Sequence, residues 1–500
     1  MGKRTVHFLM HNWSEILLGI FVLGYITYFS ILTVLRYWTL NASYFDLGIM
    51  HQTVYNTFMS LKTGDLSRFL EMTNPHGFDQ VKRMAVHNDP LLALLAPFYF
   101  IHSGPETLLV IQSAMLGAGA IIVYLLGRHI FKGEPNERLV ALFFAASYLL
   151  YPPVQLSNHF DFHAVVLATP LLLGVYYFFI KRKYVISGVC IMLALLSKEQ
   201  VGLTLFFFGL YALSRVPSTV HKEKKRLIFF SLLTSLISVI WFMLSMKVII
   251  PYFRSESHFA LKYFGDFGDS AGSIFTGLIK NPILFLQYIF RKDTYEYLYQ
   301  VLGPLGFLSL LSPLHLLIAL PEFAINLISK SGAMRNIYFH YTAVLTSFIF
   351  ISGLYGLKNF LSLFKISKRY AWFFIALFTL CSIYFSYMFS PLPYALRKEI
   401  APFTPISSEQ ADAYVWQEQL RDPHLKVMAT GHLGPLFASR RYFYNFSEHY
   451  NLADYIVLSV EEAYNSFEGE KIRVAYEELQ KDMRFSLIYK NNNFEVYKKI

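Results

Sequence analysis

The sequence has 500 residues, of which 55% are hydrophobic and only 15% charged, and its mean hydropathy is +0.40. Soluble proteins carry charge on roughly a quarter of their residues, so the composition excludes an ordinary soluble protein. The net charge of +11 reflects basic residues at the ends of apolar runs, where they set topology and meet anionic headgroups. We therefore expect membrane lipid, and no nucleic acid, as a partner. The two cysteines, Cys190 and Cys381, lie inside apolar runs and provide neither a disulfide framework nor a metal spacing.

The apolar residues form runs that predict about eleven membrane passes. The runs are 16–35, 107–127, 139–156, 164–180, 184–196, 201–213, 227–250, 301–312, 314–328, 341–356 and 370–389. A full crossing needs about 20 residues, so the runs 184–196 and 301–312 are expected to be broken or shielded by protein. The first run is too long for a signal-peptide core, and no small-residue cleavage site follows it.

Lysine and arginine are concentrated in alternate connecting segments. With the N-terminus inside, the inner segments contain Lys3, Arg4, Arg128, Lys132, Arg138, Lys181, Arg182, Lys183, Arg215, Lys222, Lys224, Lys225, Arg226, Lys358, Lys365, Lys368 and Arg369. The positive-inside rule then predicts an integral protein of the plasma membrane with a cytoplasmic N-terminus. Segments 36–105 and 251–300 and the chain after Pro391 are predicted to lie outside.

The first outer segment, 36–105, contains two stretches that predict helices at the membrane interface, 47–61 and 90–101. If 90–101 were instead a pass, every later segment would change sides and 128–138 would lie outside, so we disfavour that alternative. The second long outer segment, 251–300, is rich in aromatic residues and glycine and predicts a lid.

After the predicted membrane domain, 1–390, prolines mark a linker at 391–404 and the composition changes to that of a soluble domain. The stretches 426–432, 453–459 and 485–489 predict strands, and 408–421 and 461–482 predict helices between them. The region 405–500 is therefore predicted to be a small α/β domain on the outer face.

Four polar clusters fall on the predicted outer side. They are Asp46 with His51 and Gln52, His87 with Asp89, His159 with Asp161 and His163, and Lys198 with Glu199. The count of lysines and arginines did not require all four clusters to fall on one side. Their common side predicts that the clusters form one site close to Asp46.

The order of these clusters carries a family resemblance. Tyr44-Phe-Asp46-Leu-Gly, His87-Asn-Asp89-Pro, His159-Phe-Asp161-Phe-His163, Lys198-Glu199 and Phe339-His340-Tyr341 follow one another along nearly the whole chain. The chain resembles a family of prokaryotic predicted membrane proteins of unknown function, which in turn is similar to the GT-C superfamily of polytopic glycosyltransferases. One departure is Leu433-Gly434-Pro435, where a second histidine is common in that family.

The resemblance to GT-C enzymes implies a polyprenyl-phosphate-linked sugar donor and an acidic residue in the first outer loop. Asp46 is then the candidate general base; the alternative is that Asp46 caps a helix starting near Leu47. His87 and Asp89 are candidates to bind a metal or the donor phosphate, although Asp89 before Pro90 is also a common helix cap.

Further candidate residues surround these. His51 and Gln52 are substrate-binding candidates beside Asp46. Lys198 and Glu199 interrupt an apolar stretch, where ionisable residues usually line a cavity, and Lys198 is a candidate to hold the donor phosphate; the alternative is an ordinary turn. Arg335 and His340 are similar candidates on the outer side.

His159, Asp161 and His163 alternate, so an extended backbone would place all three side chains on one face. Three such ligands suit a divalent cation such as Mg²⁺ or Mn²⁺. The alternative is a hydrated loop at the membrane interface.

The sequence therefore predicts an inverting membrane glycosyltransferase that passes a sugar from a polyprenyl-phosphate carrier to an acceptor on the outer face. One alternative is a lipid or solute transporter or flippase, against which the sequence shows no inverted repeat. The other is a non-catalytic scaffold that presents the C-terminal domain, which would not need Asp46.

Overall fold

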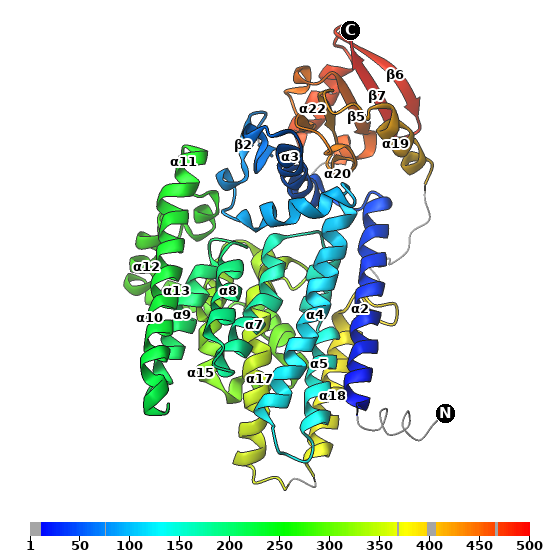
Figure 1. The fold of residues 1–500 in the computed structure, drawn as a ribbon. Coiled ribbons are helices and arrows are strands. Elements are labelled where there is room, and N and C mark those ends of the chain that lie inside the picture. Colours follow the sequence, from blue (N-terminus) through cyan, green and yellow to red (C-terminus); the bar gives the residue numbers. More distant parts are fainter. Residues whose placement is uncertain (1–11, 76, 368–369, 398–406, 466–468) are drawn as a thin grey trace, which may run out of the picture.

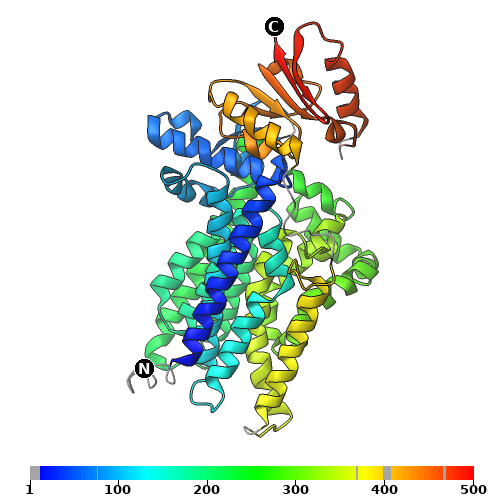
Figure 2. The same cartoon turned by 90° about the vertical axis from the view of Figure 1, so that its right-hand side faces the viewer.

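The computed structural model describes residues 12–75, 77–367, 370–397, 407–465 and 469–500. Several residues used above lie outside these ranges: Lys3, Arg4, Lys368, Arg369 and residues 398–404 of the predicted linker. The described chain is mostly helical. Its long helices run side by side, and a sheet formed by C-terminal residues lies at one end of the bundle (Figure 1, Figure 2).

Within the described residues, six helical stretches are long and apolar enough to cross a membrane. They comprise α2 (Trp13–Trp38), α4 (Glu106–Ile130), α5 (Glu137–Leu149) with α6 (Pro152–His159), α10 (His221–Leu244) with α11 (Ile250–Arg254), η12 (His340–Thr342) with α17 (Ala343–Leu363), and α18 (Ala371–Phe389). Each corresponds to a predicted run. Glu15 in the first turn of α2 and Arg36 in its last turn match the helix dipole.

Four more predicted runs form shorter apolar helices. They are η5 (Ala164–Leu167) with α7 (Ala168–Ile180), α8 (Tyr184–Leu195), α9 (Val201–Ser214), and the broken stretch α15 (Pro313–Leu316), η10 (Leu317–Ala319) and α16 (Leu320–Ile328).

The run 301–312, expected to be broken or shielded by protein, is broken and forms no continuous pass. There, α14 (Lys292–Leu302) ends and the short turns η8 (Gly303–Leu305) and η9 (Leu308–Leu311) follow. The cause is local. Pro304 lacks an amide hydrogen, and Gly306 takes a left-handed conformation with φ +59°, which stops a helix.

The segments predicted to lie inside and those predicted to lie outside are at opposite ends of the bundle. The turns after α4, α7, α9 and α17 lie at one end, and the first loop and the C-terminal sheet lie at the other (Figure 1). All four polar clusters therefore belong to the end that carries the sheet. Which side of the membrane this end faces stays a prediction.

The first loop folds as a compact layer at that end. Its elements are η1 (Tyr44–Gly48), α3 (Ile49–Thr63), η2 (Leu66–Arg68), the antiparallel pair β1 (Glu71–Thr73) and β2 (Gln80–Lys82), η3 (Arg83–Ala85) and η4 (Pro90–Phe100). Both predicted helices exist, but 90–100 is a 3₁₀ helix with Pro97 inside it. The hairpin β1–β2 was not predicted, because each strand has only three residues.

The predicted lid, 251–300, is largely helical. It contains η7 (Phe259–Phe264), α12 (Ala271–Lys280), α13 (Pro282–Ile289) and α14. Residues before and within η7 reach the cavity described below.

The C-terminal residues form a mixed sheet in the order β4-β3-β5-β7-β6. The strands are β3 (Val427–Ala429), β4 (Phe443–Asn445), β5 (Tyr455–Ser459), β6 (Phe485–Asn491) and β7 (Phe494–Lys499), and the helices are α19 (Ser408–Gln419), α20 (Gly434–Phe437), α21 (Val460–Asn465) and α22 (Glu470–Leu479). Strand β3 pairs in parallel with β4 and β5, whereas β7 pairs antiparallel with β5 and β6. The sequence did not predict β4, which is short, or β7, in which two lysines end the strand.

Candidate functional site

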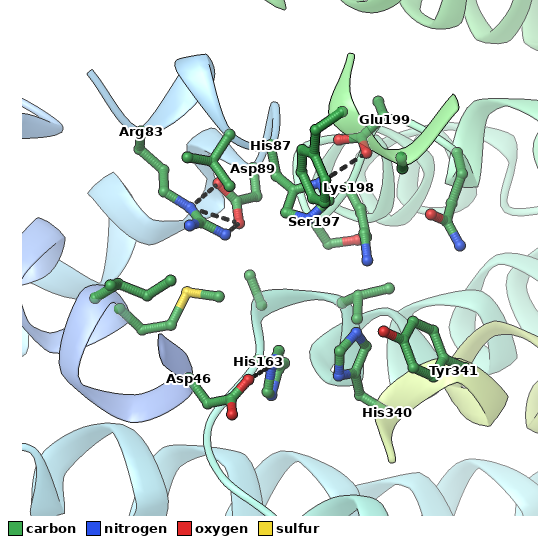
Figure 3. Close-up of a pocket in the computed structure, with 18 of the residues that line it drawn as sticks. Asp46, Arg83, His87, Asp89, His163, Ser197, Lys198, Glu199, His340 and Tyr341 are labelled. Atoms are coloured by element: carbon green, nitrogen blue, oxygen red, sulfur yellow. Dashed lines mark hydrogen bonds and ion pairs between the residues drawn. The ribbon is translucent and has the colours of Figure 1, made fainter. Parts of the chain in front are cut away.

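A cavity of about 210 Å³ lies where the first loop meets the helix bundle (Figure 3). It brings together seven of the predicted site residues: Asp46, His87, Asp89, His163, Lys198, Glu199 and His340. Residues that the sequence did not single out for the site, notably Arg83, His258 and Tyr341, also line it. In Figure 3, Asp46, His163 and His340 lie on one side of the cavity, and Arg83, Asp89 and Glu199 lie on the other.

Asp46 sits in the π-helical turn η1, and its side chain is 27% exposed. Its carboxylate oxygen Oδ1 lies 3.1 Å from Nε2 of His163. The capping interpretation of Asp46 is wrong, because Ser43 caps this turn by accepting the amide of Phe45 at 3.2 Å. Helix α3 begins after Gly48, with no side-chain cap hydrogen bond in the described chain.

Buried polar groups hold the turn of Asp46 and the side chain of its partner His163 in place. Asp161 accepts the backbone N–H of Ser43 at 3.0 Å, and its other carboxylate oxygen is 3.6 Å from Nε of Arg36. Burial raises the pKa of Asp161 to about 6, although Arg36 opposes the shift. The amide of His163 donates to Gln112 at 3.0 Å, and its ring stacks on His340 at 3.9 Å between centroids.

The C-terminal region packs directly on the Asp46 turn. The N–H of Tyr44 donates to the carbonyl of Gly431 at 2.8 Å, and the ring of Tyr44 lies 4.7 Å from that of Phe443. A Cβ on Gly434 would lie 2.5 Å from Cβ of Tyr44, so glycine permits this close approach. Gly434 thus allows the C-terminal region to support the turn that carries Asp46.

His51 and Gln52 do not line the cavity. His51 is fully buried between Tyr99 and Ser439, with both ring nitrogens at 2.8 Å from a hydroxyl. Gln52 binds the backbone of Thr73 and the carbonyls of Arg440 and Arg441. Their prediction as substrate-binding residues was based on distance along the chain, but the side chains point toward the C-terminal region and connect it to α3.

On the opposite side of the cavity, Arg83 and Asp89 form a buried ion pair. Nε and Nη2 of Arg83 donate to the carboxylate of Asp89 at 2.8–3.1 Å. Asp89 occupies the predicted N-cap position of η4, before Pro90, but in the described chain its side chain makes no cap hydrogen bond and binds Arg83 instead. Burial raises the pKa of Asp89, and Arg83 opposes this shift. The pair forms part of the cavity wall with its charges already satisfied.

Lys198 lies in the turn between α8 and α9, and its side chain points into the cavity (Figure 3). The ammonium group is 5.9 Å from the ring centroid of Tyr341. Within the described chain, no carboxylate lies within ion-pair distance of it, and burial lowers its pKa. A buried cation without an anionic partner is costly, so Lys198 is suited to bind an anionic ligand.

The neighbouring Glu199 accepts three hydrogen bonds. They come from Nδ1 of His87 at 2.9 Å, Nε2 of His258 at 3.1 Å and the amide of Asn88 at 3.0 Å. Burial lowers the pKa of His87 to about 3. Burial alone would raise the pKa of Glu199, but His87 and His258 outweigh it and the pKa lies well below its usual value. His258 thereby connects the start of η7 to Glu199 in the cavity wall.

This cluster is also the place where a metal could bind. One ligand atom from each of His87, Glu199 and His258 lies within 4.8 Å of the others, and two imidazoles with a carboxylate suit a divalent cation. The hydrogen bonds fit a metal less well. Nδ1 of His258 accepts the amide of Ala260 at 2.9 Å, so Nε2 of the neutral ring carries the proton. Metal-bound histidine normally donates from its second nitrogen.

The metal set predicted from the sequence does not assemble as expected. His159 ends helix α6, so the backbone from His159 to His163 is not one extended stretch. Asp161 binds Ser43 and Arg36, and His163 binds Asp46. Their ligand atoms do not form a group of the kind that His87, Glu199 and His258 form.

Arg335 also lies elsewhere. Its guanidinium binds Asp293 at 2.6 Å and the carbonyls of Asn326 and Ser329, and the residue does not line the cavity. It holds the loop before η12 in place. The sequence had no signal for Arg83, and it pointed to His258 only as part of the predicted lid 251–300, because the contacts of both residues depend on how distant segments pack.

Comparisons with known proteins identify the family and the fold. Residues 36–496 match the model of a family described as predicted membrane protein (DUF2079). No curated protein matches the sequence. Among solved structures, ArnT from Cupriavidus metallidurans in the apo state is similar with a TM-score of 0.51 and 12% identity, over 95% of this chain and 98% of that one. The archaeal oligosaccharyltransferase AglB from Archaeoglobus fulgidus, in complex with an inhibitory peptide and a dolichol-phosphate, has a TM-score of 0.48 and 13% identity, over 98% of this chain and 75% of that one. The similarity to ArnT shows that the fold is GT-C-like.

Proposed function

The chain belongs to the DUF2079 family of predicted membrane proteins, and from its GT-C-like fold and its cavity we propose that it is an inverting glycosyltransferase. The donor is a sugar linked to a polyprenyl phosphate, and the acceptor carries a hydroxyl group on the outer face of the membrane. The observation that carries the proposal is that Asp46 and Lys198 line one cavity. Asp46 is a partly exposed carboxylate, and Lys198 is a cation with no carboxylate of the described chain within ion-pair distance.

Asp46 acts as the general base. It takes the proton of the acceptor hydroxyl while that oxygen forms a bond to the anomeric carbon of the sugar. His163, at 3.1 Å from Oδ1, orients the carboxylate. Because attack and departure take place on opposite faces of the anomeric carbon, one base is sufficient and the configuration inverts.

Lys198 binds the donor phosphate. As the bond between the anomeric carbon and the phosphate oxygen breaks, negative charge grows on the phosphate, and a fixed cation stabilises it more than in water because the cavity is largely enclosed by protein. The polyprenyl phosphate leaves, and the proton stays on Asp46 until it passes to solvent. Arg83 contributes little here because Asp89 already neutralises it.

The test is transfer from a panel of polyprenyl-phosphate-linked sugars by the purified full-length protein in lipid nanodiscs. We expect Asp46→Asn to lower the rate about a hundred- to ten-thousand-fold, the usual effect of losing a general base, with donor binding and thermal stability kept. Asp65→Asn is the matched control, since Asp65 caps η2 outside the cavity and asparagine caps equally well.

Near wild-type transfer by Asp46→Asn would remove Asp46 as the base. If no donor in the panel reacts but a labelled lipid or solute crosses sealed vesicles containing the protein, the transport alternative takes its place. If neither occurs, the non-catalytic scaffold is the better description.

A further inference from the structure

Gln200 lines the cavity but has no role in the proposed transfer step. It follows Lys198 and Glu199 in the turn before α9, and in the described chain its side chain makes no cap hydrogen bond to that helix. Its Nε2 donates instead to Oε1 of Glu322 at 2.5 Å, across 122 positions of sequence. The side chain of Gln200 is therefore held by a residue of another helix, α16.

Glu322 itself lies behind the cavity wall and does not line the cavity. The residue is 1% exposed, and its Oε2 is buried without a hydrogen-bond partner among the described residues. Burying a carboxylate is costly. A buried carboxylate whose hydrogen bond within the described chain is to a neutral amide requires an explanation.

The explanation lies in the orientation of the amide. An amide group has one accepting and one donating end, whereas a carboxylate accepts. Because Glu322 accepts from Nε2, the amide of Gln200 cannot turn over without placing its oxygen against the carboxylate. The accepting end, Oε1, then remains, and it has no hydrogen-bond partner among the described residues. Since Gln200 lines the cavity, the pair offers the cavity an acceptor.

The position of Gln200 selects the part of a ligand that it meets. Lys198, which we assign to the donor phosphate, lies two residues earlier, and residues of one turn are within about 7 Å of each other. An amide oxygen repels phosphate oxygens, so Gln200 is suited to the group bonded to the phosphate, which is the sugar. Asp46 and Glu199 lie on opposite sides of the cavity (Figure 3), so the acceptor hydroxyl approaches from the side away from this turn.

The size of the cavity favours close contact with one sugar ring. Its volume of about 210 Å³ is below the ~300–1,000 Å³ of sites that hold drug-sized ligands. The hydroxyl groups of a single ring therefore lie near the wall.

We propose that Gln200 accepts a hydrogen bond from one hydroxyl group of the donor sugar and that Glu322 holds the amide in its accepting orientation. The cavity then selects a sugar with a hydroxyl at that ring position over the corresponding deoxy sugar. Gln200 is a specificity-determining residue, and Glu322 is a positioning residue that acts through it. The inference rests on the proposed function, because it takes the sugar of a polyprenyl-phosphate donor as the ligand.

The test is equilibrium binding to the full-length protein in lipid nanodiscs, with Asp46→Asn as the background so that no sugar is transferred. The probes are undecaprenyl phosphate and its glucose, galactose, mannose and N-acetylglucosamine derivatives. The 2-, 3-, 4- and 6-deoxy analogues of the tightest of these derivatives follow. We expect one deoxy analogue to bind about tenfold more weakly than its parent or worse, because it leaves a buried acceptor without a donor.

Gln200→Leu should remove this difference. It should weaken the parent sugar about tenfold and leave that deoxy analogue unchanged, while the other analogues keep their ratios to the parent. A disturbed cavity would weaken all the ligands alike. The double variant Gln200→Leu with Glu322→Leu is measured beside it, because it leaves no carboxylate buried and unpaired. Gln287→Leu, on an exposed glutamine of α13 outside the cavity, should change nothing.

Glu322→Gln separates orientation from packing. A glutamine at this position still binds Gln200 but can donate as well as accept, so the amide is no longer held in one orientation. The preference for the parent sugar should fall about threefold or more, measured against undecaprenyl phosphate in the same variant. That reference cancels the effect of the Glu322 charge on Lys198. Glu409→Gln is the matched control, since Glu409 accepts from the amide of Asn493 at 3.0 Å outside the cavity.

Two results would overturn the inference and leave the proposed function standing. One is that the sugar donors bind no more tightly than undecaprenyl phosphate, and the other is that the deoxy analogues lose the same affinity in the wild type and in Gln200→Leu. If no undecaprenyl-phosphate derivative binds, the proposed function and this inference fail together. If the donors bind but the protein with Asp46 intact transfers no sugar, the proposed function fails alone, and the deoxy comparison still decides the role of Gln200.

Discussion

Asp46 and Asp89 line the same cavity but have opposite surroundings. Asp89 is buried, and two donors of Arg83 bind its carboxylate. Asp46 is 27% exposed, and its partner among the described residues is His163. The same contrast separates the cations, since Arg83 is paired and, within the described chain, Lys198 has no carboxylate at ion-pair distance. The paired groups build the wall, and Asp46 and Lys198 face the cavity in which we propose that the donor binds.

The largest change in stability should come from breaking the ion pair between Arg83 and Asp89. We expect Asp89→Ala to cost about 3–5 kcal/mol of unfolding free energy, because it leaves the charge of Arg83 buried and unpaired. Asp46→Ala, on the open side, should cost less than about 1 kcal/mol. Unfolding in mixed micelles measures both.

The double variant Arg83→Met with Asp89→Leu is the control for this prediction. It removes both charges at similar volume, and such replacements are often neutral or stabilising. If the double variant is no more stable than Asp89→Ala, the loss comes from packing and not from the unpaired charge.

Lys198→Met should weaken donor binding without lowering stability, the reverse of what we expect for Asp89→Ala. The ammonium is buried, no carboxylate in the described parts of the chain lies within ion-pair distance, and burial lowers its pKa, so its removal should leave stability unchanged or raise it. Binding of the polyprenyl-phosphate donor should weaken about tenfold or more, as expected when a charged hydrogen-bond donor to phosphate is lost. Equilibrium binding of a labelled donor measures this.

Lys62→Met is the matched control, because the ammonium of Lys62 also lies 5.9 Å from an aromatic ring, that of Phe58, but in an exposed position. Equal donor affinity in the wild type and Lys198→Met would contradict the assignment of Lys198 to the phosphate.

Acid should weaken the contact between α3 and the C-terminal region. Burial lowers the pKa of His51 from 6.5 to about 3, so between these values the unfolded chain binds a proton that the folded chain excludes. Stability is therefore lost as pH falls through this window, by about 2 kcal/mol at pH 5.

Hydrogen exchange in α3 and in residues 436–446 should rise between pH 7 and pH 5 once intrinsic rates are corrected. His51→Gln should lack this dependence, and an identical pH response in that variant would exclude His51 as its source.

The predictions from sequence succeeded where the signal is local. Apolar runs located the long helices, and basic residues at their ends separated the two ends of the bundle that Figure 1 shows. The same separation placed Asp46, His87, His163 and Lys198 at one end, where they line one cavity.

The failures have a common physical cause. Which side of a helix faces a cavity depends on what packs against it, and the partners are far away in the chain. His51 meets Ser439, 388 positions away, and His258 meets Glu199, 59 positions away. The spacing His-x-Asp-x-His predicted one face only if the backbone were extended, but His159 belongs to a helix. Such contacts carry no local pattern.

The smallest expected effect is that of metal removal. Glu199 already accepts three hydrogen bonds, and the second nitrogen of His258 accepts an amide instead of donating, so the cluster is satisfied without a cation. We expect EDTA to leave the thermal unfolding midpoint unchanged and elemental analysis to find no stoichiometric metal in the purified protein. His258→Ala should lower the midpoint, because it removes a hydrogen bond to a buried carboxylate. One equivalent of zinc or manganese, together with a lower midpoint after EDTA, would instead make His87, Glu199 and His258 a metal centre, and the paired side of the cavity would then bind a ligand of its own.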